Sequence, residues 1–65
     1  MDKTSLIWAA LHRLTERGWT WSWEPHETWT QGHWIKAWKD DVVQIVIGYD
    51  DFLESMLAEI DQIGV

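Results

Sequence analysis

The segment Trp19-Thr20-Trp21-Ser22-Trp23-Glu24 alternates indole and polar side chains with a period of two. Strict alternation of this kind is typical of a β-strand that is half buried, because successive side chains point to opposite faces. The polar run Glu24-Pro25-His26-Glu27 follows it and has the composition of a turn. We therefore predict a strand over residues 19–24 that presents its three tryptophans to one side.

The second strand is expected to begin at Thr28-Trp29-Thr30 and to end near Trp38. It contains Gly32, and a glycine inside a strand often marks a bulge of one extra residue. Such a bulge would bring Trp29, Trp34 and Trp38 to one face. The first strand's Trp19, Trp21 and Trp23 can join that face from the neighbouring strand. The other face would then carry hydroxyl side chains that suit water: Thr20, Ser22, Thr28 and Thr30.

A third strand is predicted after the turn Lys39-Asp40-Asp41. Its sequence, Val42-Val43-Gln44-Ile45-Val46-Ile47, is apolar on nearly both faces and ends at Gly48. Strands of this composition are usually covered on both sides. We expect it to be the most buried strand of the sheet.

Two amphipathic helices flank the strands. Residues 4–17 carry apolar side chains at helical spacing, with cap candidates before them and Gly18 after them. The last segment shows the same spacing, with Asp51 and Glu54 as a capping box at its start and Gly64 at its end. The apolar positions are Ile7, Ala10, Leu11 and Leu14 in the first helix and Leu53, Met56, Leu57 and Ile60 in the second; the first helix's cap candidates are Asp2, Thr4 and Ser5.

The order of elements predicts an α+β fold with a helix, a three-stranded antiparallel meander and a second helix. Both helices are expected on one face of the sheet, where the tryptophans would form the core. Residues 1–65 form a single compact domain in this prediction, because the chain is shorter than one usual domain. Domains this small are marginally stable, so a homodimer is one way to gain stability.

The composition excludes several classes. The chain has no cysteine, and it shows neither a signal peptide nor a long apolar run, so we expect a cytoplasmic protein without disulfides or membrane spans. No nucleophile elbow, phosphate loop or zinc motif is present, which predicts no enzyme, no cofactor and no metal. The side chains that could serve such sites lack the required spacing: Ser5, Ser22 and Ser55 for catalysis, and His12, His26, His33, Glu24 and Glu27 for a metal.

The charge is strongly regional. Residues 1–39 hold five basic and four acidic side chains, whereas residues 40–65 hold seven acidic and no basic ones, within a formal net charge of −6. This balance argues against direct nucleic-acid binding and favours a partner protein with a basic surface. At about 100° per residue, Asp50, Glu54 and Asp61 form one stripe beside the apolar face of the second helix. The predicted partner-binding residues are Asp40, Asp41, Asp50, Asp51, Glu54 and Asp61, together with Trp8 and Tyr49.

In size and charge the chain resembles the small acidic inhibitors encoded by phages and mobile elements, including anti-CRISPR proteins and nucleic-acid mimics. The resemblance implies a non-enzymatic protein that binds and inhibits a basic or nucleic-acid-binding partner. Two alternatives remain open. One is a module that binds ligands on an exposed tryptophan face, and the other is a self-associating structural protein.

Overall fold

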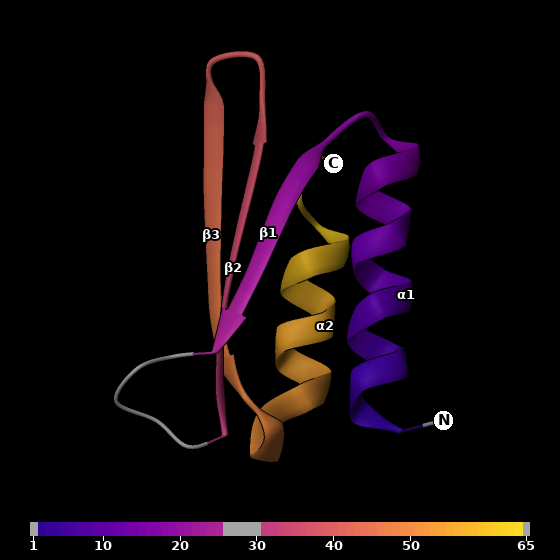
Figure 1. Cartoon of the computed structure of the whole chain (residues 1–65), viewed down its shortest axis with the longest axis vertical. Coiled ribbons are helices and arrows are strands. Elements are labelled where there is room, and N and C mark those ends of the chain that lie inside the picture. The colour runs from indigo at the N-terminus through magenta and orange to yellow at the C-terminus, as the bar shows by residue number, and fades with distance from the viewer. Residues whose placement is uncertain (1, 26–30, 65) are drawn as a thin grey trace.

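The structure is a computed structural model that describes residues 2–25 and 31–64 (Figure 1). It confirms the predicted order of helix, three strands and helix. A short 3-10 turn, η1, precedes the last helix. The elements are α1 (Lys3–Glu16), β1 (Thr20–Pro25), β2 (Gly32–Lys39), β3 (Val42–Tyr49), η1 (Asp50–Phe52) and α2 (Leu53–Asp61).

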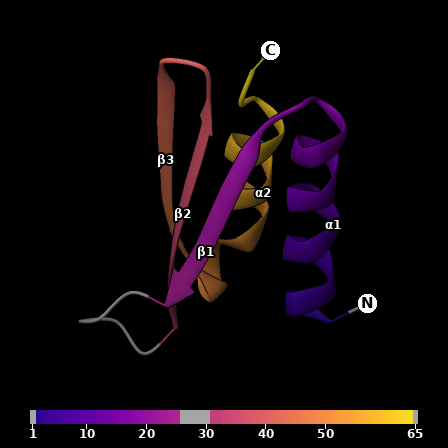
Figure 2. The ribbon, with the colours of Figure 1, turned by 45° about the horizontal axis from the view of Figure 1, so that its top comes forward.

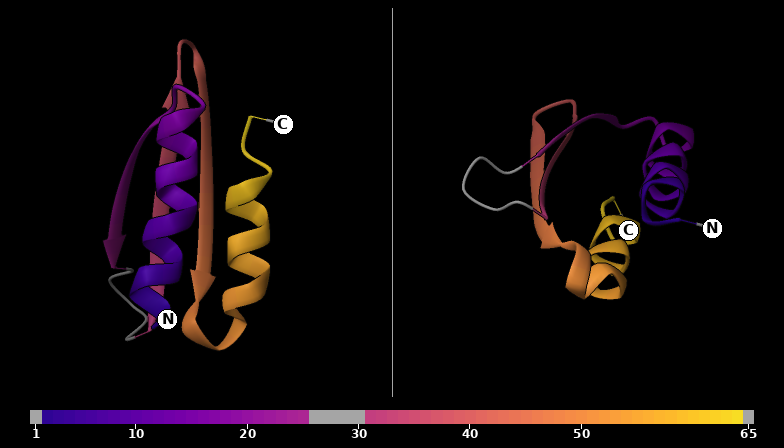
Figure 3. Two further views of the ribbon diagram at one scale, coloured as in Figure 1. Left: turned by 90° about the vertical axis from the view of Figure 1, so that its right-hand side faces the viewer. Right: turned by 60° about the horizontal axis from the view of Figure 1, so that its bottom comes forward.

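The three strands form one antiparallel sheet in the order β1-β2-β3. Both helices lie on the same side of it and run next to each other (Figure 1, Figure 2). The right-hand view of Figure 3 shows this two-layer arrangement most directly. We call the side of the sheet that faces the helices the inner face and the opposite side the outer face. The predicted α+β architecture is therefore confirmed.

Helix α1 begins and ends as its sequence indicates. The backbone N–H of Ser5 donates to the Asp2 carboxylate over 2.7 Å, which makes Asp2 the N-cap. At the other end Gly18 has φ of 88°, and the N–H of Trp19 reaches the carbonyl of Leu14. This is a Schellman ending, which favours glycine in the left-handed region. Within the described residues, no helix has the length and hydropathy needed to cross a bilayer.

The Asp2 cap gives a pH-dependent contribution to stability. The hydrogen bond from Ser5 lowers the pKa of Asp2 below its ordinary value of 3.8. A depressed carboxyl pKa stabilises the folded state at pH values above 3.8 and loses this contribution as the pH falls through the folded pKa. We expect Asp2→Ala to lower the melting temperature at pH 7, and the difference from wild type to shrink below pH 3.8. Asp2→Asn keeps an acceptor that does not titrate, so its melting temperature should stay above that of Asp2→Ala by the same margin at low pH, as followed by circular dichroism.

The predicted start of α2 was wrong. Asp51 and Glu54 form no capping box, because η1 occupies residues 50–52 and α2 begins at Leu53 with Phe52 at the cap position. No side-chain hydrogen bond caps either element. Asp50 therefore lies outside α2, and the predicted helical stripe of Asp50, Glu54 and Asp61 does not form.

The core lies between the inner face and the two helices. Its fully buried side chains come from α1, β2, α2 and the segment after α2, with Trp21, Trp23, Leu53 and Leu57 packed around it. Trp19 follows the end of α1 and lies against Gly64, whose φ is 80°. The buried set is Ile7, Ala10, Leu11, Leu14, Trp19, Ile35, Ala37, Val46, Met56, Ile60 and Ile63.

The predicted bulge at Gly32, and the common tryptophan face that depends on it, are wrong. Gly32 begins β2, and the pairing of β2 with both neighbours continues without a slip through residues 33–38. Trp21 pairs with Ala37 and Trp23 pairs with Ile35, so these tryptophans share the inner face with small or aliphatic residues. Trp34 and Trp38 consequently lie on the outer face. Trp29, Thr28 and Thr30 lie outside the described residues.

The prediction for β3 was also wrong. Only Val46 and Gly48 of this strand are buried, although the strand is almost entirely apolar. The cause is its position: β3 is at an edge of the sheet, and both helices pack on the inner face. The side chains on the other face of β3 therefore remain in contact with solvent.

Candidate protein-binding surface

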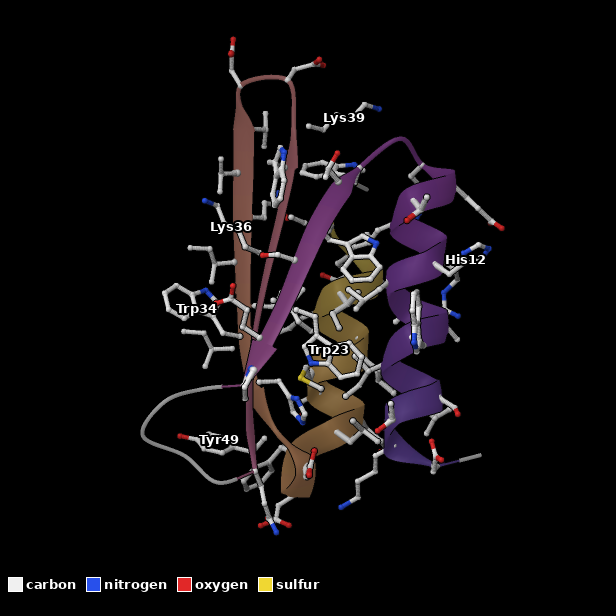
Figure 4. The ribbon with its side chains drawn as sticks, in the orientation of Figure 1. His12, Trp23, Trp34, Lys36, Lys39 and Tyr49 are labelled. Carbon is white, nitrogen blue, oxygen red and sulfur yellow. The ribbon has the colours of Figure 1, made fainter. Side chains whose placement is uncertain are left out.

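The outer face presents an apolar strip that runs along β3 and includes the two tryptophans of β2, with Lys36 between them. The sheet register aligns Trp38 with Val43, Lys36 with Ile45, and Trp34 with Ile47. Figure 4 shows Trp34, Lys36 and Tyr49 pointing away from the helices and Trp23 pointing toward them. We define the outer strip as Trp34, Trp38, Val43, Ile45, Ile47 and Tyr49.

All of these side chains except the half-buried Trp38 are unusually exposed for their type. The exposed fraction is 54% for Val43, 52% for Ile45, 47% for Ile47 and 42% for Trp34. Single exposed apolar side chains are normal, but a contiguous row of large ones is typical of an interaction surface. The outer strip is thus the strongest candidate binding surface among the described residues.

Polar side chains border the strip on the β1 side. Ser22 pairs with Lys36 and Glu24 pairs with Trp34 across the two strands. Together these four residues line a shallow hollow of about 280 Å³. The ammonium of Lys36 lies 5.7 Å from the ring centre of Trp38, so it turns toward that indole as a cation–π contact. The strip is apolar along β3 and becomes polar toward β1.

Carboxylates stand at both ends of β3. Asp40 and Asp41 form the turn before it, where Asp40 adopts a positive φ of 53°. Asp50 and Asp51 follow it in η1. The nine residue steps from Asp41 to Asp50, at about 3.3 Å each, place the two acidic pairs about 30 Å apart. The structure thus brings four of the predicted acidic residues to the two ends of the outer strip.

Asp50 also has a structural role. Its Oδ1 lies 2.6 Å from Nε2 of His33, and Nδ1 of His33 lies 3.1 Å from the indole nitrogen of Trp23. An indole N–H only donates, so Nδ1 accepts and Nε2 carries the proton that is donated to Asp50. These two hydrogen bonds join β1, β2 and η1. Asp50 is therefore held in place, while Asp51 next to it is exposed.

Tyr49 and Glu54 belong to the same end of the strip. Tyr49 contacts Phe52 edge to face, with ring centres 6.5 Å apart, and Phe52 is 66% exposed. Glu54 lines a second shallow hollow of about 370 Å³ with residues 50–53 and Ser55. Apolar and acidic groups are thus combined at the C-terminal end of β3.

The other two predicted residues lie elsewhere. Asp61 pairs with Arg13 through both carboxylate oxygens, at 2.9 and 3.1 Å, and this contact raises the pKa of Arg13. Exposed pairs of this kind contribute at most about 1 kcal/mol. Trp8 is 53% exposed on α1 and meets Trp21 edge to face at 5.4 Å. Neither residue is on the outer face, so neither belongs to the outer strip.

Groups suited to chemistry are sparse in the described parts of the chain. No three His, Cys, Asp or Glu side chains among residues 2–25 and 31–64 are placed to share a metal ion. His26 and Glu27 lie outside these ranges. Among the described residues, the only contacts between a histidine and a carboxylate are His33 with Asp50 and the 3.5 Å pair of His12 with Glu16.

The sequence analysis did not select most of the outer strip. The sequence of β2 did contain a feature that identifies the exposed face. Lys36 lies between Trp34 and Trp38 on one face, while Ile35 and Ala37 lie on the other. A lysine rarely lies inside a core without a partner, so its position marks the exposed face. The residues missed were Trp34, Trp38, Val43, Ile45 and Ile47.

The chain was compared with protein-family models, curated proteins and solved structures, and none of the three comparisons found a match.

Proposed function

We propose that this protein is a non-enzymatic binding module that docks a partner protein with a basic surface on the outer strip. The observation that carries the proposal is the exposed apolar row Val43, Ile45 and Ile47 with acidic pairs at both of its ends. Interfaces commonly combine an apolar centre, which supplies affinity, with a charged rim, which steers association and sets specificity.

The size and form of the surface favour a protein over a small ligand. Pockets for small molecules are concave and enclose most of the ligand, whereas the hollow beside Trp34 is open and shallow. The apolar row instead follows the whole length of β3. An elongated apolar row of this kind suits contact with another polypeptide.

The charge distribution favours a basic partner. The acidic pairs flank the apolar row, and residues 40–65 contain no basic side chain. A partner that normally binds nucleic acid carries clustered lysine and arginine, which such carboxylates attract. Occupying that surface would exclude the nucleic acid, so inhibition is the proposed consequence of binding.

The test compares the wild type with the double variant Ile45→Thr/Ile47→Thr. Proteins that cross-link to the wild type in cells that produce it are identified and purified. Each is then titrated by calorimetry against the wild type and against the double variant. We expect the variant to bind at least about 100-fold more weakly, because it removes two central apolar contacts. Binding of the wild type should also weaken strongly between roughly 0.05 and 0.5 M salt. Glu59→Gln, an exposed change on α2, is the matched control and should bind normally.

Two results would contradict the proposal. One is a reconstituted complex that the double variant forms with wild-type affinity. The other is an affinity that does not respond to salt. Because threonine keeps the β-branched shape, circular dichroism of the variant should remain that of the wild type.

A further inference from the structure

We propose that the partner adds an extended segment, uncharged in its centre and basic at both ends, as a fourth strand along the edge of β3 that faces away from β2. This inference rests on the function proposed above and specifies how the partner binds. Strand addition supplies affinity through the backbone and selects side chains that alternate between the two faces.

The backbone of β3 is available for pairing on one side. In the described part of the chain, residues 42–48 form backbone hydrogen bonds with β2 alone. In an antiparallel ladder about every second residue directs its N–H and C=O to the other side. These outward groups of β3 are the donors and acceptors that an added strand would meet.

The sequence of this edge strand lacks the features that usually prevent pairing. Edge strands are commonly blunted by charged residues, proline or bulges. Residues 42–48 contain no charge and no proline, and their register with β2 is uninterrupted. The edge at β1 differs, since that strand carries Glu24 and ends at Pro25. Pairing is therefore expected at β3 and not at β1.

An added strand would also cover the side chains of the outer strip. Ile45 and Ile47 are about half exposed and point to the outer face. A neighbouring strand lies about 4.8 Å away, which places its own outward side chains against them. Apolar or β-branched residues at alternate positions of the partner segment would bury this row.

The charges at the ends of β3 identify the occupant as a partner and not as a second copy. If two copies paired antiparallel, Asp40 and Asp41 of one would meet Asp50 and Asp51 of the other. If they paired parallel, each acidic pair would meet its own equivalent. Both arrangements bring like charges together, which is unfavourable. Lysine or arginine at both ends of the added strand removes this conflict.

The experiment uses the full chain and three synthetic decapeptides. The first alternates threonine and valine between two lysines at each end. The second has glutamates in place of the lysines, and the third has the basic sequence with every second backbone amide methylated, which blocks pairing along one edge. Affinity is measured by calorimetry, and amide exchange of residues 42–48 is followed by nuclear magnetic resonance.

We expect the basic peptide to bind and to slow exchange of the outward amides of β3 by at least about tenfold. The acidic and methylated peptides should bind at least about tenfold more weakly. The inference is overturned if the basic peptide gives no protection, if methylation has no effect, or if sedimentation shows that the protein self-associates through residues 42–48. Any of these results can occur while Ile45→Thr/Ile47→Thr still loses partner binding as expected. In that case only strand addition is rejected, and the proposed function stands.

Discussion

Gly48→Val is expected to destabilise the protein strongly at 25 °C, although valine favours strands more than glycine does. Gly48 lies on the inner face of β3, where α2 crosses it. A Cβ at this position would stand 2.7 Å from Cγ and Sδ of Met56 and 2.8 Å from its Cβ. The Cβ of Met56 is fixed to the helix backbone, so rotation of the methionine does not relieve the contact. Either β3 or α2 must move, at an expected loss of more than about 3 kcal/mol.

This loss is large for a chain of 65 residues. At roughly 0.05 to 0.15 kcal/mol per residue its total stability is only about 3 to 10 kcal/mol. Urea unfolding followed by circular dichroism measures the change, with Gly48→Ala as a milder variant expected to lose about 1 to 3 kcal/mol. Met56→Ala should relieve part of the effect of Gly48→Val, because it removes Cγ and Sδ. A Gly48→Val protein as stable as the wild type, or one whose loss is independent of Met56, would contradict the close packing of α2 on β3.

The sequence was sufficient to predict the elements and their order, because those depend on local patterns. Residues 4–17 carry an unambiguous helical period and a capped start, and α1 was found within one residue of its predicted bounds. The alternation of Trp19, Trp21 and Trp23 likewise gave β1. Each signal concerns neighbours in the chain, so it does not depend on how the elements pack.

Which face each strand buries was predicted less well, because that depends on pairing between strands. A period of two states that Trp34 and Trp38 share a face, but not whether that face is the one Trp21 occupies. With the assumed bulge at Gly32, Trp34 and Trp38 were assigned to the face of Trp21, which is the opposite of the face they occupy. Since the whole strand changes face with a shift of one residue, a single wrong assumption moved both tryptophans from the outer face into the predicted core.

The candidate surface was anticipated through its charge and through Tyr49, but not through the rest of its apolar row. A cluster of carboxylates is visible in composition, so Asp40, Asp41 and Asp51 could be selected without a fold. Their apolar complement could not, because Val43 and Ile45 resemble the residues of a buried strand until the position of β3 at the edge is known. Asp61 was selected by its charge although it is not part of the surface. It pairs with Arg13 of α1, which is far from it in the sequence.

The same substitution at two isoleucines on adjacent strands should separate the two faces of the sheet. Ile35 in β2 is fully buried, whereas Ile45 in β3 is 52% exposed. Ile35→Thr leaves a hydroxyl without a partner in the core and removes apolar contacts with Val46 and the helices, so we expect a loss of about 3 to 4 kcal/mol. Ile45→Thr keeps the β-branched side chain at a solvent-exposed position and should change stability by less than about 1 kcal/mol.

Urea denaturation of both variants measures this difference in stability. The two variants should also weaken partner binding for different reasons. Ile45→Thr should weaken the complex while the protein remains folded, because in the proposed complex its side chain contacts the partner. Ile35→Thr should weaken it only to the extent that the protein unfolds, so its loss of binding should disappear when titrations are corrected for the folded fraction. Comparable losses of stability at the two sites would mean that the outer face is covered in the native protein. In that case the outer strip is not exposed for a partner, and the proposed function is rejected.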